Sequence, residues 1–258
     1  MVDLLLTLPR FAIIIILAIV FNLFSQALLF LLHKYSYRGI FKGQNSDVFI
    51  SSLNIVFSLI IAFVFIGVWQ SHSNVTNVVL KESELMVDIN TNINGYAEDQ
   101  KKLAVPAFRD YVEEVVYKEY DSIHLKNKQD INAIHKLNKF NNIVLAYEPT
   151  TNGQLALHQE ILKLVSEYKN IRRERCNYNE PLIANILWDI LIFITFLYIF
   201  LLCLSHIEKL SVHSFLVFIF TCSISTIFAL LILYDRPFSG PQAIDYSFLK
   251  EAFINNIK

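Results

Sequence analysis

The chain has 258 residues, of which 54% are hydrophobic and only 17% charged, and its formal net charge is -1. Soluble domains usually carry about 25% charged residues, so this composition excludes an ordinary soluble protein. A nearly neutral chain has no electrostatic attraction to nucleic acid, which is therefore not an expected partner.

Four apolar stretches are long enough to cross a bilayer, which takes about 20 residues of helix. They are Phe11–Leu32, Phe49–Trp69, Leu182–Leu204 and His213–Tyr234. None contains proline, and a segment in hydrocarbon must satisfy its own backbone hydrogen bonds, so each is predicted to be a helix. The first is longer than the apolar core of a signal peptide and no cleavage site follows it, so we interpret it as a retained anchor.

The spans are expected to form two hairpins on either side of a polar region. We divide the chain into a first transmembrane hairpin (1–70), a helical cytosolic domain (71–180), a second transmembrane hairpin (181–235) and a cytosolic C-terminal tail (236–258). An even number of spans places both termini and the polar region on the same side of the membrane. The fold class predicted is an all-α integral membrane protein.

Apolar residues at helical spacing predict four helices in the polar region. The first continues the second span without a break. The others cover about Glu98–Tyr120, Ile131–Tyr147 and Gln154–Arg175. Pro106 is expected to kink the second of the four or to lie at its start.

Basic residues near the span ends predict the orientation. The side that holds the termini carries Arg10, Lys81, Arg172, Arg173, Arg175 and Arg236, and the other carries Lys34, Arg38, Lys42 and Lys209. The first set is the larger, so the termini and the helical domain are expected in the cytoplasm.

One face of the second span carries the main functional prediction. Residues at spacings of three and four make up this face: Ser51, Asn54, Ser58, Ile61, Phe65 and Trp69, with Glu82 further along the same line. A face that passes from polar to apolar to acidic is typical of a pore-lining helix, and its apolar middle can gate by dewetting. The alternative is a packing face on which serine and asparagine bond neighbouring helices together.

Polar residues in the other spans are also candidates. Asn22 and Gln26 lie one turn apart, and interhelical hydrogen bonding is the favoured role. Asp189 is an intramembrane carboxylate, about 10 Å in from Leu182, and such groups are functional candidates. Its alternative role is an ion pair with a basic residue such as Arg236 or Arg10.

Sequence motifs for catalysis or cofactor binding are missing. There is no phosphate-binding loop, no GxGxxG, no HExxH and no GxSxG, and the seven histidines have no metal-ligand spacing. We therefore predict no enzymatic activity, no cofactor and no metal site.

Three stretches carry a resemblance to a known family. They are WQSHSNVTNVVLKESEL (69–85), IRRERCNYNEPLIANILWDIL (171–191) and LYDRPFSG (233–240). With the layout of two hairpins, they resemble the bacterial family of bestrophin-like membrane proteins. The DRPFSG after the last span is the most specific piece. Its Asp235 and Arg236 are interpreted as structural, and Pro237 as the residue that stops the span.

The resemblance implies a homopentameric ion channel in the bacterial cytoplasmic membrane, with a central pore lined by the second span. Its implied partners are other copies of the chain, membrane lipid and a permeant inorganic ion. On this sequence the implied pore face is the one already described. The second span has no neck motif of Ile, Pro and Phe, and no acidic cluster resembles the calcium clasp of animal bestrophins. Calcium gating is therefore not carried over.

Ion selectivity is predicted from the charges near this face. Animal bestrophins pass anions, which implies chloride. The predicted pore face, however, has no Lys or Arg, and Glu82, Glu84 and Asp88 follow it. Acidic rings favour cations, so a monovalent cation, potassium, is slightly favoured. A chloride channel and a non-conducting membrane scaffold or sensor are the alternatives. A transporter with Asp189 as proton carrier would need an inverted repeat, and none is visible.

Overall fold

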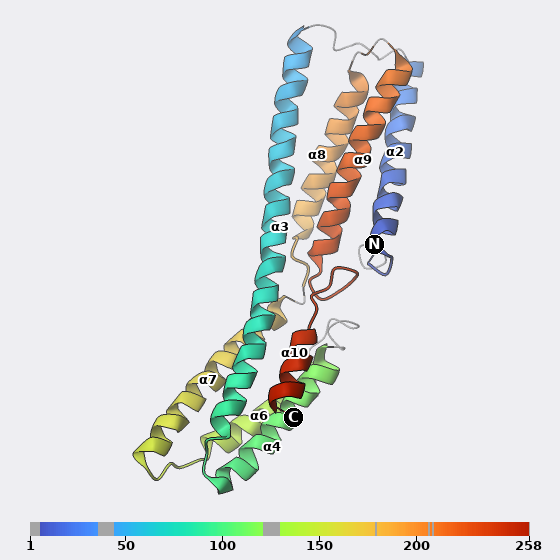
Figure 1. The fold of residues 1–258 in the computed structure, drawn as a ribbon. Coiled ribbons are helices and arrows are strands. Elements are labelled where there is room, and N and C mark those ends of the chain that lie inside the picture. Colours follow the sequence, from blue (N-terminus) through green and yellow to red (C-terminus); the bar gives the residue numbers. More distant parts are fainter. Residues whose placement is uncertain are drawn as a thin grey trace. The chain divides into compact units, whose positions relative to one another are not determined.

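A computed structural model describes residues 6–35, 44–120, 130–178, 180–205, 207 and 209–257 (Figure 1). Every regular element in these ranges is a helix. Arg38 and Lys42, which entered the orientation prediction, lie outside the described residues. The chain divides into two compact units, which are described separately.

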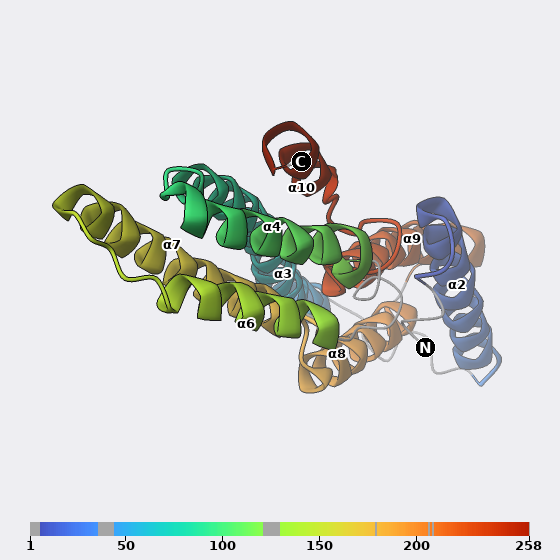
Figure 2. The same ribbon diagram turned by 90° about the horizontal axis from the view of Figure 1, so that it is seen from below.

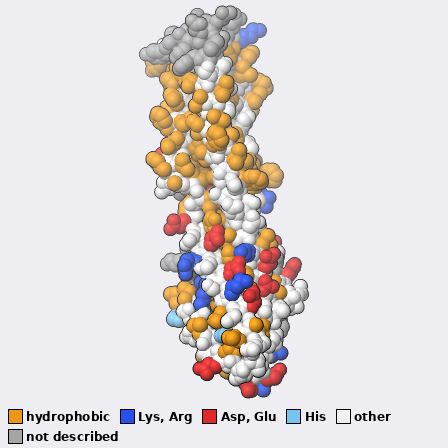
Figure 3. All heavy atoms as spheres, turned by 90° about the vertical axis from the view of Figure 1, so that its left-hand side faces the viewer, with side chains coloured by type: hydrophobic (Ala, Val, Ile, Leu, Met, Phe, Trp, Pro, Cys, Tyr) orange, Lys and Arg blue, Asp and Glu red, His pale blue; other side chains and the backbone are white. Residues whose placement is uncertain are grey.

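The first unit comprises residues 1–72, 181–236 and 240–242 and holds the spanning helices. These are α2 (Arg10–Lys34), the first part of α3 (Gln44–Ile93), α8 (Asn185–Leu204) and α9 (Leu210–Asp235). All four are long and apolar enough to cross a membrane. The prediction of an all-α membrane protein with four spanning helices is confirmed. Large hydrophobic side chains remain exposed on these helices, as expected for a surface that meets lipid (Figure 3).

Helix α8 begins three residues later than the sequence predicted. The backbone N–H of Leu182 donates to the Asp235 carbonyl at 2.9 Å, and that of Ile183 donates to the Asp235 carboxylate at 2.7 Å. Asp235 is buried at the end of α9, and its two acceptors fix the bend at Leu182 and Ile183 before α8 starts at Asn185. The structural role predicted for Asp235 is confirmed by these bonds.

Polar side chains join α2 to α9. Asn22 donates to the sulfur of Cys222 at 3.3 Å and accepts from the Thr221 hydroxyl at 2.8 Å. One turn along, Gln26 donates to the Ser214 carbonyl at 3.0 Å and accepts from the Ser214 hydroxyl at 2.7 Å. The predicted interhelical role of Asn22 and Gln26 is confirmed.

The second unit comprises residues 73–180, 237–239 and 243–258. It contains the rest of α3, followed by α4 (Glu98–Glu114), the π-helix η1 (Val115–Glu119), α6 (Ile131–Leu145), α7 (Asn152–Asn177), α10 (Ser247–Ala252) and the π-helix η2 (Phe253–Ile257). Helix α6 packs against both α4 and α7 (Figure 2). We call this the helical unit.

The helical unit has its own hydrophobic core, built from the apolar stripes of its helices. Fully buried side chains such as Ile89, Phe108, Phe140 and Ile161 come from α3, α4, α6 and α7. The prediction that α3 continues from the second span is confirmed by its 50-residue length. Pro106 lies inside α4, on its exposed side, so it does not mark the helix start.

Replacing Asn22 with Leu should destabilise the first unit, because the bond from Thr221 and the bond to Cys222 both disappear. Interhelical hydrogen bonds in membranes are worth about 0.6–2 kcal/mol, and we expect a loss of that size in detergent unfolding. The matched control is Thr226→Val. The exposed Thr226 hydroxyl bonds only to the Cys222 carbonyl of its own helix. An equal loss in both variants would contradict the interhelical role.

Candidate functional site

The polar side chains of the predicted pore face are exposed in the single chain. Ser51, Asn54 and Ser58 are all exposed on α3. Within the described residues none of the three makes a side-chain hydrogen bond, in contrast to Asn22 and Gln26 on α2. A polar side chain at membrane depth is costly unless water or another protein surface satisfies it. Among the described residues, nothing therefore satisfies these three side chains.

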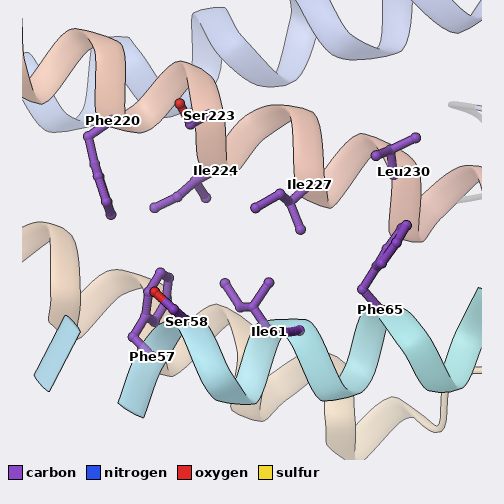
Figure 4. A pocket seen from close by; sticks show the side chains of 10 residues that line it. Phe57, Ser58, Ile61, Phe65, Phe220, Ser223, Ile224, Ile227 and Leu230 are labelled. Atoms are coloured by element: carbon purple, nitrogen blue, oxygen red, sulfur yellow. The ribbon is translucent and has the colours of Figure 1, made fainter. Parts of the chain in front are cut away.

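The apolar part of the face borders a groove between α3 and α9. The groove has a volume of about 290 Å³, and ten residues line it: Phe57, Ser58, Ile61, Ala62 and Phe65 from α3, and Phe220, Ser223, Ile224, Ile227 and Leu230 from α9 (Figure 4). Ile61 is buried, at 5% exposure, whereas Phe65 is half-buried and extends toward Leu230. The structure thus brings Ser58, Ile61 and Phe65 together, while Ser51 and Asn54 lie outside the groove lining.

Glu82 does not have the surroundings that the sequence suggested. Its side chain is fully buried in the helical unit, and its Oε2 lies 2.6 Å from Nε of Arg175, which is also fully buried. The hydroxyl of Tyr120 donates to the same oxygen at 3.1 Å, and that of Tyr168 donates to Oε1 at 3.3 Å. A carboxylate that is enclosed and neutralised in this way presents no charge to a pore, so we do not retain Glu82 as a pore-lining residue.

Comparison with known proteins identifies the family of this chain. The family model for the bestrophin-like domain matches residues 16–247. The chain belongs to the bestrophin-like family. Neither the curated proteins nor the solved structures gave a match. Bestrophins are channels and not enzymes, so membership assigns this membrane protein to the channel class.

Glu82 belongs to a buried ionic cluster, which we define as Glu82, Glu119, Arg172 and Arg175. Nη2 of Arg172 donates to one oxygen of Glu119 at 2.6 Å, and Nη2 of Arg175 donates to the other at 3.3 Å. Arg175 also lies over the ring of Tyr120, 4.7 Å from its centroid. The cluster therefore balances two negative charges with two positive ones inside the helical unit of this bestrophin-like chain.

Electrostatics inside the cluster keep the arginines charged. Burial alone would lower the pKa of Arg175, but Glu82, Tyr120 and Glu119 around it hold that pKa well above its usual value. Burial also raises the pKa of Tyr168 well above its ordinary value, so its hydroxyl stays protonated and can donate to Glu82.

The sequence missed this cluster, although two weak signals were present. Arg172 and Arg175 are three residues apart, so they share one face of α7, and they were interpreted only as basic residues near a span end. Glu119 follows the buried Val115 by four residues, which places a carboxylate on an apolar stripe. The π-helix η1 that carries Glu119 has no evident sequence signal.

Asp189 lies closer to its helix start than predicted. The sequence placed the start of this helix at Leu182, about 10 Å from Asp189. Because α8 in fact begins at Asn185, Asp189 lies about 6 Å from the helix start. Its side chain is exposed, and within the described residues it forms no ion pair. Arg10, one of the partners considered, donates instead to the Pro241 carbonyl at 3.1 Å.

Replacing Arg175 with Met should strongly destabilise the helical unit, because Glu82 would remain buried without its counter-charge. Removing one partner of a buried pair costs about 3–5 kcal/mol. The matched control is Glu167→Gln, which breaks the exposed bridge from Lys81 to Glu167 between the same two helices, α3 and α7. Such exposed pairs contribute little to stability, because water screens both charges. Similar unfolding midpoints for the two variants would show that the buried cluster is not a main stabilising element.

Proposed function

We propose that this bestrophin-like protein is a homo-oligomeric ion channel, a pentamer, whose central pore is lined by α3 and which passes monovalent cations, with potassium as the expected ion. The membrane is the bacterial cytoplasmic membrane, and the termini and the helical unit face the cytoplasm. Family membership supports the channel class. The pore lining, the subunit number, the orientation and the ion are the parts that we propose.

One observation carries the assignment of the pore to α3. Ser51, Asn54 and Ser58 are exposed and make no side-chain hydrogen bond within the described residues, although they lie on a helix that crosses the membrane. The polar residues Asn22 and Gln26 of α2 are, by contrast, satisfied by α9. A water-filled pore on the oligomer axis would hydrate the three open side chains of α3 in every subunit.

Phe65 is the proposed constriction. Its half-buried ring stands at the edge of the groove, and Ile61 packs behind it against α9. A ring of such side chains around an axis would form an apolar neck, which can close by excluding water. Ile61 supports this neck from the interior of the subunit.

Charge along α3 favours cations. The exposed Glu84 and Asp88 add negative charge beyond the spanning segment. The one exposed lysine nearby on α3, Lys81, is paired with Glu167 at 2.6 Å. A negatively charged approach raises the local concentration of cations and opposes anions.

Variants of the proposed pore face should change ion flux in proteoliposomes. Phe65→Ala removes the apolar constriction and should raise flux, whereas Asn54→Leu removes a hydrating side chain and should lower it. Phe63→Ala is the matched control, because Phe63 is a phenylalanine of the same helix on a different, exposed face. Size-exclusion profiles would confirm equal assembly. Unchanged flux in both test variants would refute the pore assignment.

Reversal potentials in a potassium chloride gradient should lie close to the potassium equilibrium potential if the pore selects cations. A reversal potential close to that of chloride would make the protein an anion channel with the same pore. No current from wild-type protein in any bilayer would identify a non-conducting scaffold.

A further inference from the structure

We propose that the buried ionic cluster sets the open probability of the channel, by positioning the chain segments that lead into three of the spanning helices. This inference rests on the proposed channel function and concerns its control. The four charged residues of the cluster lie outside the proposed conduction path, so they would act through α3 as positioning residues.

Three segments that continue into spanning helices meet at this cluster within the helical unit. Glu82 lies on α3, the helix that carries the proposed pore face. Arg175 is in the last turn of α7, ten residues before α8 begins at Asn185. Phe238 follows the end of α9 at Asp235 by three residues, and its ring lies 6.5 Å from that of Tyr120 in an edge-on arrangement.

Tyr120 contacts both the buried ionic cluster and the segment that follows α9. Its hydroxyl bonds to Glu82, its ring stacks on Tyr246 at 4.9 Å and contacts Phe238, and the guanidinium of Arg175 lies over it. Phe238 is the phenylalanine of the DRPFSG stretch. The side chain of Phe238 therefore lies against Tyr120, whose hydroxyl bonds to Glu82 of the buried ionic cluster.

The cluster is suited to adopting more than one arrangement. Nε of Arg172 and Nη1 of Arg175 are buried and have no hydrogen-bond partner among the described residues. Glu119 divides its two oxygens between both arginines, with unequal distances of 2.6 and 3.3 Å. Spare donors beside a shared acceptor allow the carboxylate to exchange partners without losing its charge balance. Discrete alternative pairings of this kind are what a two-state element requires.

Helix α3 provides the route to the pore. It is unbroken from Gln44 to Ile93 and contains no proline, the usual cause of a kink. The proposal is that a shift at Glu82 is transmitted along this helix. Glu82 follows Phe65 by 17 residues, about 25 Å along the helix axis.

Single-channel recording of Glu82→Gln tests the proposal. The variant keeps the shape of the side chain and removes its charge. We expect open probability to change by about fivefold or more, the usual scale of coupling between sites, with unitary conductance and reversal potential unchanged. The matched control is Lys81→Gln, at the adjacent position on α3, whose exposed bridge also joins α3 to α7. It should leave open probability at the wild-type value.

A second variant keeps the test decisive if Glu82→Gln does not assemble. Tyr120→Phe removes only the hydroxyl that bonds to Glu82 and preserves the ring contacts, and it should shift open probability in the same direction. A purely structural cluster would reduce the yield of assembled channels and leave the open probability of each channel unchanged. That result in an assembled variant, with wild-type channels conducting, would overturn this inference alone. A wild-type protein without current would overturn the proposed channel and this inference together.

Discussion

The constraint on which this structure depends is that polar groups at membrane depth must find partners within protein or water. Asn22 and Gln26 on α2 meet it through Ser214, Thr221 and Cys222 of α9. Asp235 meets it by accepting the backbone donors that precede α8. The described chain provides no such partner for the polar face of α3. The two spanning helices therefore differ: the polar face of α2 is satisfied by α9, whereas the polar face of α3 is exposed among the described residues.

The same constraint applies to the helical unit, where the buried polar groups are charged side chains. Two carboxylates and two guanidinium groups are removed from water together, and their pairing offsets much of the cost of burying each one. Such an arrangement adds less stability than an apolar core of equal volume often would, but it is far more demanding in geometry. The control role proposed for the cluster rests instead on its spare donors and on the acceptor that its two arginines share.

Hydropathy alone was sufficient to predict the four spans, because the bilayer fixes the length of an apolar helix. The roles of Asn22 and Gln26 also followed from spacing. The spacing of residues along one helix could not show which residues of other helices pack against a given face. Helical periodicity placed Glu82 correctly on α3, but its partner Arg175 comes from another helix much later in the chain. The start of α8 was displaced for a similar reason, since a tertiary bond to Asp235 competes with local helix propensity.

Helix α3 therefore changes its environment along a face that looks continuous in sequence. Its polar residues Ser51 and Asn54 are open, Ile61 is covered by α9, and Glu82 is enclosed by helices of the other unit. One helical face thus has two environments: it is exposed at Ser51 and Asn54, and it is enclosed within the helical unit at Glu82. Glu82, which the sequence suggested as part of a pore, is better understood as the residue through which α3 is attached within the helical unit.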